Sequence, residues 1–218
     1  MYTGVFFKRY ILGLWAMAEG IIYDMFDADK HVQKITDFFR RLKDGERYVS
    51  CDHGTQNATV FLLWNKGNNG KWYCVREYYY SGRAKGKQKT DGEYADDFEK
   101  WLDGVPIRAV IVDPAAASFI AELGKRGYRV LKADNDVEDG IREVASMLNM
   151  GLLVFCDTCI NTIMEFGSYI WDEKAAQRGE DRPVKENDHG MDAVRYFVYT
   201  ILSKRTGRVK NKAKYGFD

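Results

Sequence analysis

Three aspartates lie where an acidic side chain could take part in chemistry: Asp52, Asp113 and Asp192. Asp52 ends a strand-like run, Asp113 follows the apolar run VIV, and Asp192 lies one turn into a long apolar helix. A carboxylate at the end of an apolar strand is costly unless a cation meets it. Two hard cations about 3.5–4 Å apart need several carboxylate oxygens to hold them. The three acids therefore predict a divalent-metal site of the kind that hydrolyses phosphodiesters.

His189 lies three residues before Asp192, so both side chains point to one side of the same helix. A histidine there either carries protons beside the metal or forms a hydrogen bond at the helix start, and we favour the first. Each acid also has an ordinary structural interpretation, as a turn opener or a strand end, with Asp188 or Asn187 as a helix N-cap. We give the catalytic interpretation more weight because the three acids arrive from three separate elements.

The elements that would position these acids follow a regular order. The predicted strands are, in chain order, residues 48–50, 59–64, 72–80, 107–112, 128–131 and 152–155. The second and third flank a Gly/Asn turn at 67–70, which predicts an antiparallel hairpin, and the later strands alternate with helical stripes, which indicates parallel βα units. This order predicts an α/β fold with a mixed sheet and helices on both faces. Asp113 then lies at the C-terminal edge of a parallel strand, where such sheets place ligand sites.

The length and composition predict one main domain. With 218 residues, of which 45% are apolar, the chain can bury one substantial core. We expect this domain at residues 46–203, after a linker or docking segment at 1–45 that includes a short helix at about 31–42. A basic tail follows at 204–218.

The cellular setting is predicted from what the sequence contains. No stretch approaches the ~18 apolar residues of a membrane span, so we expect a soluble intracellular protein. The cysteines lie in apolar segments and fit reduced core thiols better than disulfides: Cys51, Cys74, Cys156 and Cys159.

The charge of the chain is balanced overall but uneven locally. Lys and Arg number 33 and Asp and Glu 32, and the net charge of +1 neither requires nor excludes a polyanionic partner. Residues 83–89 (RAKGKQK) and 203–214 (SKRTGRVKNKAK) are nevertheless basic and could follow a phosphate backbone. A solvated loop and a disordered tail are the ordinary alternatives.

Four segments carry a resemblance to a known family: RYVSCDHGTQNATVFLLW, AVIVDPAAASFIAELGKRGYRV, KADNDVEDGIREVASMLNMGLL and NDHGMDAVRYFVY. They resemble the C-terminal nuclease domain of tailed-bacteriophage terminase large subunits, whose fold is RNase H-like. The lead-in KRYILGLWAMAEGIIYDMFD is similar to the segment that joins the ATPase domain of that family to its nuclease. The resemblance covers nearly the whole chain and implies a mixed five-stranded sheet.

The resemblance implies an activity and a site. It places Asp52, Asp113 and Asp192 on the family's metal-binding catalytic acids, with His189 near them, and implies two Mg²⁺ or Mn²⁺ ions. The implied reaction is the cutting of concatemeric double-stranded viral DNA during packaging, with little sequence specificity, in the cytoplasm of the bacterial host. The implied phosphate-contacting residues, on two segments beside the cleft, are Arg83, Lys85, Lys87, Lys89, Lys174, Arg178 and Arg182.

The resemblance also implies partners in a larger protein: an ATPase motor domain, a portal and a small terminase subunit. The family's motor needs a P-loop, and no GxxxxGK[ST] occurs in this sequence. We therefore expect this chain to be the nuclease part alone, without ATP-driven translocation.

Two alternatives stay open. The acids and the order of elements also fit other RNase H-like nucleases, such as a ribonuclease H or a junction resolvase. A non-catalytic module that docks onto DNA or a portal through the aromatic lead-in and the basic tail is the alternative outside enzymes.

Overall fold

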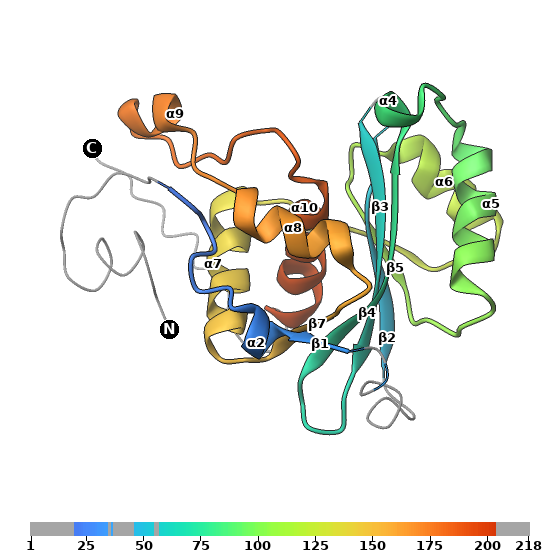
Figure 1. Cartoon of the computed structure of the whole chain (residues 1–218). Helices are drawn as coiled ribbons and strands as arrows, with labels where there is room; N and C mark the ends of the chain where they lie inside the picture. The colour runs from blue at the N-terminus through green and yellow to red at the C-terminus, as the bar shows by residue number, and fades with distance from the viewer. Residues whose placement is uncertain (1–19, 35, 37–45, 55–56, 204–218) are drawn as a thin grey trace, which may run out of the picture.

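The centre of the molecule is a seven-stranded mixed sheet with strand order β1-β7-β4-β3-β2-β5-β6 (Figure 1). The computed structural model describes residues 20–34, 36, 46–54 and 57–203. The strands are β1 Val32–Gln33, β2 Arg47–Asp52, β3 Ala58–Lys66, β4 Trp72–Ser81, β5 Val110–Val112, β6 Val130–Lys132 and β7 Leu153–Cys156. The predicted mixed α/β sheet is confirmed. It has seven strands rather than the five that the resemblance implies, because the short strands β1 and β6 extend it at the two edges.

The strand pairing explains where the sheet can carry a site. β2, β3 and β4 form an antiparallel meander, and β5 then pairs with β2 in parallel. The register sets Cys51 opposite Val112, so the next residue of each strand reaches the same edge of the sheet. On the other side of the meander, β7 pairs with β4 in parallel. The carboxyl ends of β2 and β5 are therefore neighbours.

Helices cover both faces of the sheet, with α7, α8 and α10 on one side and α5 and α6 on the other (Figure 1). The helices are α2 Ala28–His31, α4 Gly82–Lys85, α5 Asp91–Leu102, α6 Ala117–Lys125, α7 Val137–Asn149, α8 Ile160–Ser168, α9 Glu173–Gln177 and α10 His189–Phe197, which continues into a π-helical turn at Val198–Leu202. Each face has its own apolar core.

Aromatic packing fixes α10 against the sheet. The indole of Trp64 on β3 stacks on the ring of Phe197, with 4.4 Å between centroids and 9° between planes. The same indole donates a hydrogen bond of 2.9 Å from Nε1 to Oγ of the buried Ser50 on β2. Because buried aromatic pairs and satisfied polar groups each restrict movement, this contact fixes the C-terminal end of α10 against β2 and β3.

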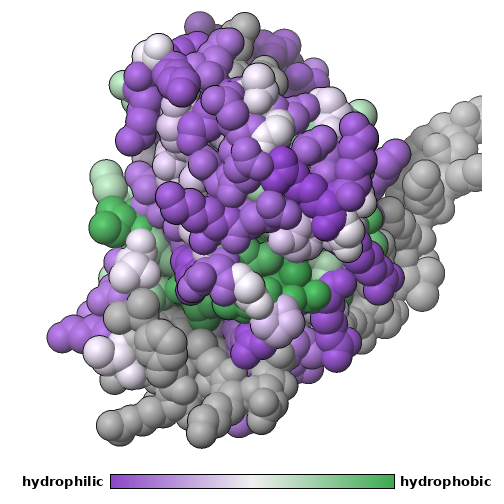
Figure 2. Space-filling view, turned by 90° about the vertical axis from the view of Figure 1, so that its right-hand side faces the viewer, coloured by the Kyte–Doolittle hydropathy of each residue, from purple (hydrophilic) through white to green (hydrophobic). Residues whose placement is uncertain are grey.

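In the opposite layer, α5 is stabilised by a cap at its N-terminus and by a buried apolar face. α5 begins with a capping box in which Thr90 and Glu93 satisfy each other's backbone amides. Its inner face buries Tyr94, Phe98 and Leu102. The outer surface on the side of α5 and α6 is mainly hydrophilic, with a smaller hydrophobic area (Figure 2), as expected for helices that bury one face.

Part of the N-terminal lead-in packs against the domain. The amide of Ile22 donates to the carbonyl of Tyr169 at 2.9 Å, and His31 Nε2 lies 3.0 Å from the carbonyl oxygen of Leu148. The helix expected at about 31–42 is wrong at its start, because residues 32–33 form β1 beside β7. Residues 35 and 37–42 of that expected helix, residues 1–19 and the basic tail at 204–218 lie outside the described residues.

The predictions about the cysteines and about membrane-spanning segments can be compared with the described residues. The four cysteines are free and buried, as expected of reduced core thiols. Within the described part of the chain, no helix has the length and apolar character needed to cross a membrane.

Candidate active site

The three predicted acids line one cleft at the carboxyl edge of the sheet. Asp52 is the last residue of β2, and Asp113 follows β5 directly. Asp192 enters from the first turn of α10, which packs across β2 and β3. The cleft has a volume of about 570 Å³, and its lining includes all three acids together with His189 and Tyr196. The structure therefore brings these side chains to one cavity.

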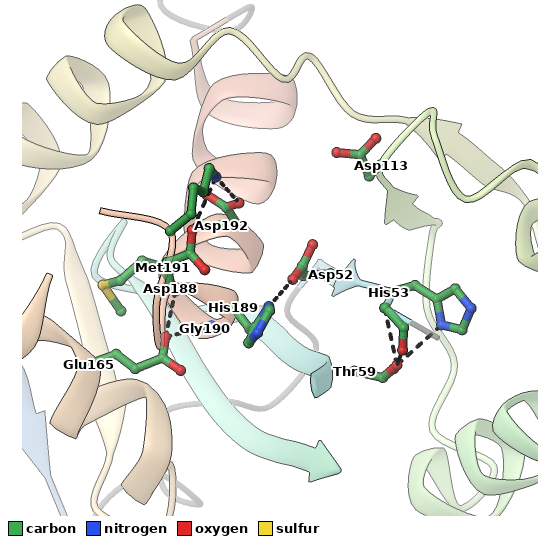
Figure 3. Close-up of polar contacts among 12 residues, drawn as sticks. Asp52, His53, Thr59, Asp113, Glu165, Asp188, His189, Gly190, Met191 and Asp192 are labelled. Atoms are coloured by element: carbon green, nitrogen blue, oxygen red, sulfur yellow. Dashed lines mark hydrogen bonds and ion pairs between the residues drawn. The ribbon is translucent and has the colours of Figure 1, made fainter. Parts of the chain in front are cut away.

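The acids do not form a tight cluster of oxygens. Figure 3 shows Asp113 apart from Asp52 and Asp192. Among the residues that the structure describes, no group of three or more His, Cys, Asp or Glu side chains is arranged to hold a metal ion. The sequence analysis expected the carboxylates to gather closely, and the structure corrects this expectation. Each acid is instead matched with a hydrogen-bond donor of its own.

Each acid has a different donor. Asp52 Oδ2 lies 2.8 Å from Nδ1 of His189, and Asp113 Oδ2 accepts a 2.5 Å hydrogen bond from the hydroxyl of Tyr196. The backbone amide of Ala115 donates to the other oxygen of Asp113 at 2.7 Å. Carboxylates repel one another at short range, and donors from the surrounding elements separate them here.

Both oxygens of Asp192 accept from cationic side chains. Arg195 Nη2 donates to Oδ1 at 2.8 Å, and Lys185 Nζ donates to Oδ2 at 3.2 Å. Arg195 is 2% exposed, and its Nη1 also donates to the carbonyl of Asn135 at 2.9 Å. A Cβ on Gly140 would lie 2.6 Å from Cγ of Arg195, so this glycine makes room for the arginine. The partners of Asp192 therefore include one cation fixed in the core.

The electrostatics of Asp52 reflect burial among other acids. Burial raises the pKa of Asp52 to about 6; the hydrogen bond from His189 acts against this, and the charges of Asp192 and Asp188 add to it. For His189, burial opposes the charged imidazolium, but the hydrogen bond to Asp52 and the nearby acids outweigh it and raise the pKa. The hydrogen bond between the two side chains therefore favours the charged form of each, and burial opposes it.

Asp188 is a site residue that the sequence analysis treated as an ordinary helix cap. It occupies the N-cap position of α10, but its side chain forms no capping hydrogen bond. It is 5% exposed, lines the cleft, and holds Lys185 Nζ at 3.1 Å from Oδ2. Figure 3 shows it beside Asp192. Its spacing of four residues from Asp192, on one helix face, is the signal that could have identified it.

The start of α10 is capped by an acid from another helix. Glu165 on α8 is 4% exposed, and its Oε2 accepts from the amides of Gly190 at 2.7 Å and Met191 at 3.1 Å (Figure 3). The hydroxyl of Tyr79 donates to Oε1 at 3.0 Å. Burial raises the pKa of Glu165 to about 7, although these hydrogen bonds act to lower it. A Cβ at Gly190 would lie 2.8 Å from Glu165 Oε2, so the close contact requires glycine.

A second acid fixes α8 in the same way. Glu77 on β4 accepts hydrogen bonds from the amide of Asn161 at 2.9 Å and the amide of Thr162 at 2.8 Å, at the first turn of α8. Carboxylates at helix N-termini satisfy free amides and match the helix dipole. The central sheet thus positions α8, and α8 positions the helix that carries His189 and Asp192.

The basic residues of the 83–89 segment differ in their access to the cleft. Arg83 lines it. Lys87 pairs with Glu93 at 3.9 Å, and Lys89 pairs with Asp97 while its ammonium lies 4.1 Å from the centre of the Tyr80 ring. Lys85 is exposed on α4.

The second predicted basic segment lies around α9. Arg178 and Arg182 both pair with Glu180, at 3.7 Å and 3.2 Å, and Lys174 is exposed on α9. The residues that line the cleft do not include these three, but they do include Lys185 from the following loop. α4 and α9 lie toward the same end of the molecule (Figure 1).

Comparison with known proteins identifies relatives that match about nine-tenths of the chain. No protein-family model matches the chain. The large terminase of a thermophilic bacteriophage, in a structure with bound ADP, is 56% identical and superimposes with a TM-score of 0.86, over 92% of this chain and 50% of that one. The terminase large subunit of Escherichia phage T5 is 26% identical over 206 residues, 90% of this chain and 45% of its own length. The chain thus spans about half the length of these relatives.

Two isolated domains share the fold at lower identity. The nuclease domain of the P22 large terminase is 18% identical, with a TM-score of 0.65 over 85% of this chain and 94% of that domain. The large terminase nuclease of the thermophilic phage G20c, in a structure with bound cobalt, is 12% identical, with a TM-score of 0.59 over 86% of this chain and 99% of that one.

Proposed function

Because this chain corresponds to the nuclease part of phage terminase large subunits, with their RNase H-like fold, we propose that it is a metal-dependent DNA endonuclease. Its substrate in this proposal is concatemeric double-stranded viral DNA, which it cuts during genome packaging with little sequence specificity. The observation that carries the proposal is the convergence of acids from β2, β5 and α10 on one cleft at the carboxyl edge of the sheet.

The donor chemistry of the cleft fits hard divalent cations. We propose Asp52, Asp113 and Asp192 as ligands of two Mg²⁺ or Mn²⁺ ions, and we add Asp188, which enters from the same helix as Asp192. Oxygen ligands are those that such ions prefer. The pKa of Asp52 is raised first by burial, and the charges of Asp192 and Asp188 add to this; a cation beside these acids would favour the ionised carboxylate. The cobalt bound to the related G20c nuclease is consistent with a divalent ion.

Of the two acids at the start of α10, Asp188 needs less rearrangement than Asp192 to bind a metal ion. Its Oδ2 contacts the side chain of Lys185, whose own exposed fraction is 63%. Asp192 also contacts Lys185 through Oδ2, but its Oδ1 is held by Arg195, which is buried and also bound to backbone carbonyls. We therefore propose Asp188 as the first ligand from this helix and Asp192 as the second.

The chain's own residues have distinct tasks in the reaction. When bound, the metal ions would activate a water and stabilise the leaving oxygen. His189 Nδ1, 2.8 Å from Oδ2 of Asp52, can hold a proton against that carboxylate, and Nε2 of the neutral ring would then be the atom that accepts a proton from the cleft. Tyr196 orients Asp113 through its hydroxyl. Glu165 acts through α10, as a positioning residue for His189.

DNA would reach the acids between two basic flanks. Arg83 and Lys185 line the cleft itself, and we propose them as its phosphate contacts. The proposed outer contacts are Lys85, Lys87, Lys89, Lys174, Arg178 and Arg182. Contacts to phosphates position a duplex without reading its bases, which is consistent with cleavage of little sequence specificity.

The setting of this activity is also a proposal, because the chain spans about half of its relatives. We propose that it acts in the cytoplasm of the bacterial host, in a protein that also carries an ATPase motor domain. The portal and the small terminase subunit are the proposed packaging partners.

A cleavage assay tests the proposal directly. Supercoiled plasmid and linear duplex would be incubated with Mg²⁺, Mn²⁺ or a chelator, using the wild type and the Asp52→Asn and Asp113→Asn variants. We expect cleavage with the metals only, and a loss of about 100-fold or more in each variant. Asp103→Asn is the matched control, because Asp103 is an exposed helix end with φ of 53°, which Asn tolerates.

The same assay separates the alternatives. Faster cleavage of an RNA–DNA hybrid than of duplex DNA would favour a ribonuclease H. Full activity in Asp52→Asn or Asp113→Asn would remove that residue from the site. A wild type that binds DNA but neither cleaves it nor binds Mn²⁺ would favour a docking module.

A further inference from the structure

One lysine bridges the two acids of α10. Lys185 lies in the loop between α9 and α10, with its Nζ 3.1 Å from Asp188 Oδ2 and 3.2 Å from Asp192 Oδ2. The loop is attached nearby, because the amide of Val184 donates to the carbonyl of Ile170 at 2.9 Å. The ammonium group is therefore held at carboxylates that line the cleft.

The contact joins an exposed cation to buried anions. The side chain of Lys185 is 63% exposed, whereas those of Asp188 and Asp192 are 7% and 10% exposed. Lysine is a compact point charge on a flexible stem, so it can leave without disturbing the core.

Arg195 provides the contrast on the same helix. It is 2% exposed, and its guanidinium is held by the carbonyls of Asn135 and Asp136 as well as by Asp192. Moving it would leave the buried carboxylate of Asp192 without its buried cationic partner. Of the two cations that contact Asp192, Lys185 is thus the exchangeable one and Arg195 the fixed one.

We propose that Lys185 is a resident counter-ion that competes with divalent cations for Asp188 and Asp192, and thereby sets the metal concentration at which the site loads. The inference rests on the proposed function, since it takes these acids as metal ligands. A divalent ion bonds to carboxylate oxygens at about 2.0–2.6 Å, and an ammonium group on the same oxygens blocks that approach. Loading through the two Oδ2 atoms therefore requires Lys185 to move away.

The test measures metal binding without DNA. Mn²⁺ would be titrated into the wild type and Lys185→Gln by isothermal calorimetry at low ionic strength. We expect Lys185→Gln to bind Mn²⁺ about three- to tenfold more tightly, because a partly exposed ion pair no longer has to be broken. Lys185→Arg, which retains the positive charge, should keep an affinity close to that of the wild type.

Lys30→Gln is the matched control. Lys30 forms an ion pair of the same length, 3.1 Å, with Asp27, and its side chain is 75% exposed. It does not line the cleft. The control changes the net charge equally, so an equal gain in affinity in Lys30→Gln would show a general charge effect and overturn the proposal.

The outcomes distinguish a failure of the proposed function from a failure of the proposed role of Lys185. A wild type that binds no Mn²⁺ at millimolar concentration would overturn the proposed function itself. Wild-type binding with equal or weaker binding by Lys185→Gln would overturn only the role of Lys185. Thermal unfolding gives a second readout: without metal, Lys185→Gln should melt below the wild type because Asp188 and Asp192 repel, and Mn²⁺ should raise its Tm more.

Discussion

Glu165 Oε2 accepts a 2.7 Å hydrogen bond from the backbone amide of Gly190, so a buried acid of one helix caps another helix. The capped helix, α10, carries Asp192 in its first turn and begins at His189. Side chains in a reaction site need positions fixed to about 0.5 Å. The contact between Glu165 and Gly190 therefore joins the stability of the fold to the geometry of the proposed active site.

Replacing Glu165 by alanine should destabilise the protein by about 2–3 kcal/mol, because two amides and a tyrosine hydroxyl lose their acceptor in a buried setting. Urea denaturation at pH 7 would measure the loss. Glu173→Ala is the control, since Glu173 is also an acid in the first turn of a helix, but an exposed one. A change of less than about 0.5 kcal/mol is expected there. Equal losses in both variants would contradict a special role for Glu165.

The stability of the protein should fall as the pH rises from about 4.5 to about 7, in part because of Glu165. Its pKa is raised from 4.5 to about 7 in the folded state, mainly by burial. The folded protein therefore binds more protons than the unfolded chain in this window, and this contribution to stability is present at low pH and lost through pH 7. Glu165→Gln cannot titrate, so its free energy of unfolding should vary less between pH 5 and pH 8. An unchanged slope would exclude Glu165 as the source.

The positions of Asp52 and Asp113 could be predicted from the sequence because local signals determine them. Each follows an apolar run, and acids at the ends of buried strands need a reason to be there. The two residues lie at the same edge of the sheet because β2 pairs with β5 in parallel. The alternation of strands and helices likewise predicted the mixed sheet, whereas the two-residue strand β1 is too short to leave a pattern.

The supporting acids could not be predicted because their partners are remote backbone groups. Glu165 binds amides 25 residues farther along the chain, and Glu77 binds amides more than 80 residues away. In the sequence, both look like ordinary polar residues of a helix and a strand. The pairing of Asp192 with Arg195 was missed although the two are three residues apart, because helix geometry alone does not show which partner a buried acid selects.

Asp188→Asn and Asp192→Asn should separate catalysis from folding. Asp188→Asn should lower Mn²⁺-dependent plasmid cleavage by about 100-fold or more, while changing stability by about 1 kcal/mol or less, since its ion-pair partner Lys185 is exposed. Asp192→Asn should cost about 2–4 kcal/mol, because the buried Arg195 loses its carboxylate. Denaturation curves and cleavage rates on the same samples measure both effects. The reverse pattern would make Asp192 the principal ligand of α10.

Arg83→Gln should weaken binding of duplex DNA of any sequence. Arg83 is the residue of the 83–89 segment that lines the cleft, whereas Lys87 and Lys89 pair with acids of α5. One lost phosphate contact should reduce the slope of log affinity against log salt by about 1. Fluorescence anisotropy with the chelated, non-cleaving protein at several salt concentrations would measure this. Lys87→Gln is the matched control and should change the slope less, because its ammonium already has a carboxylate partner. Equal slopes for Arg83→Gln and the wild type would place the DNA away from this side of the cleft.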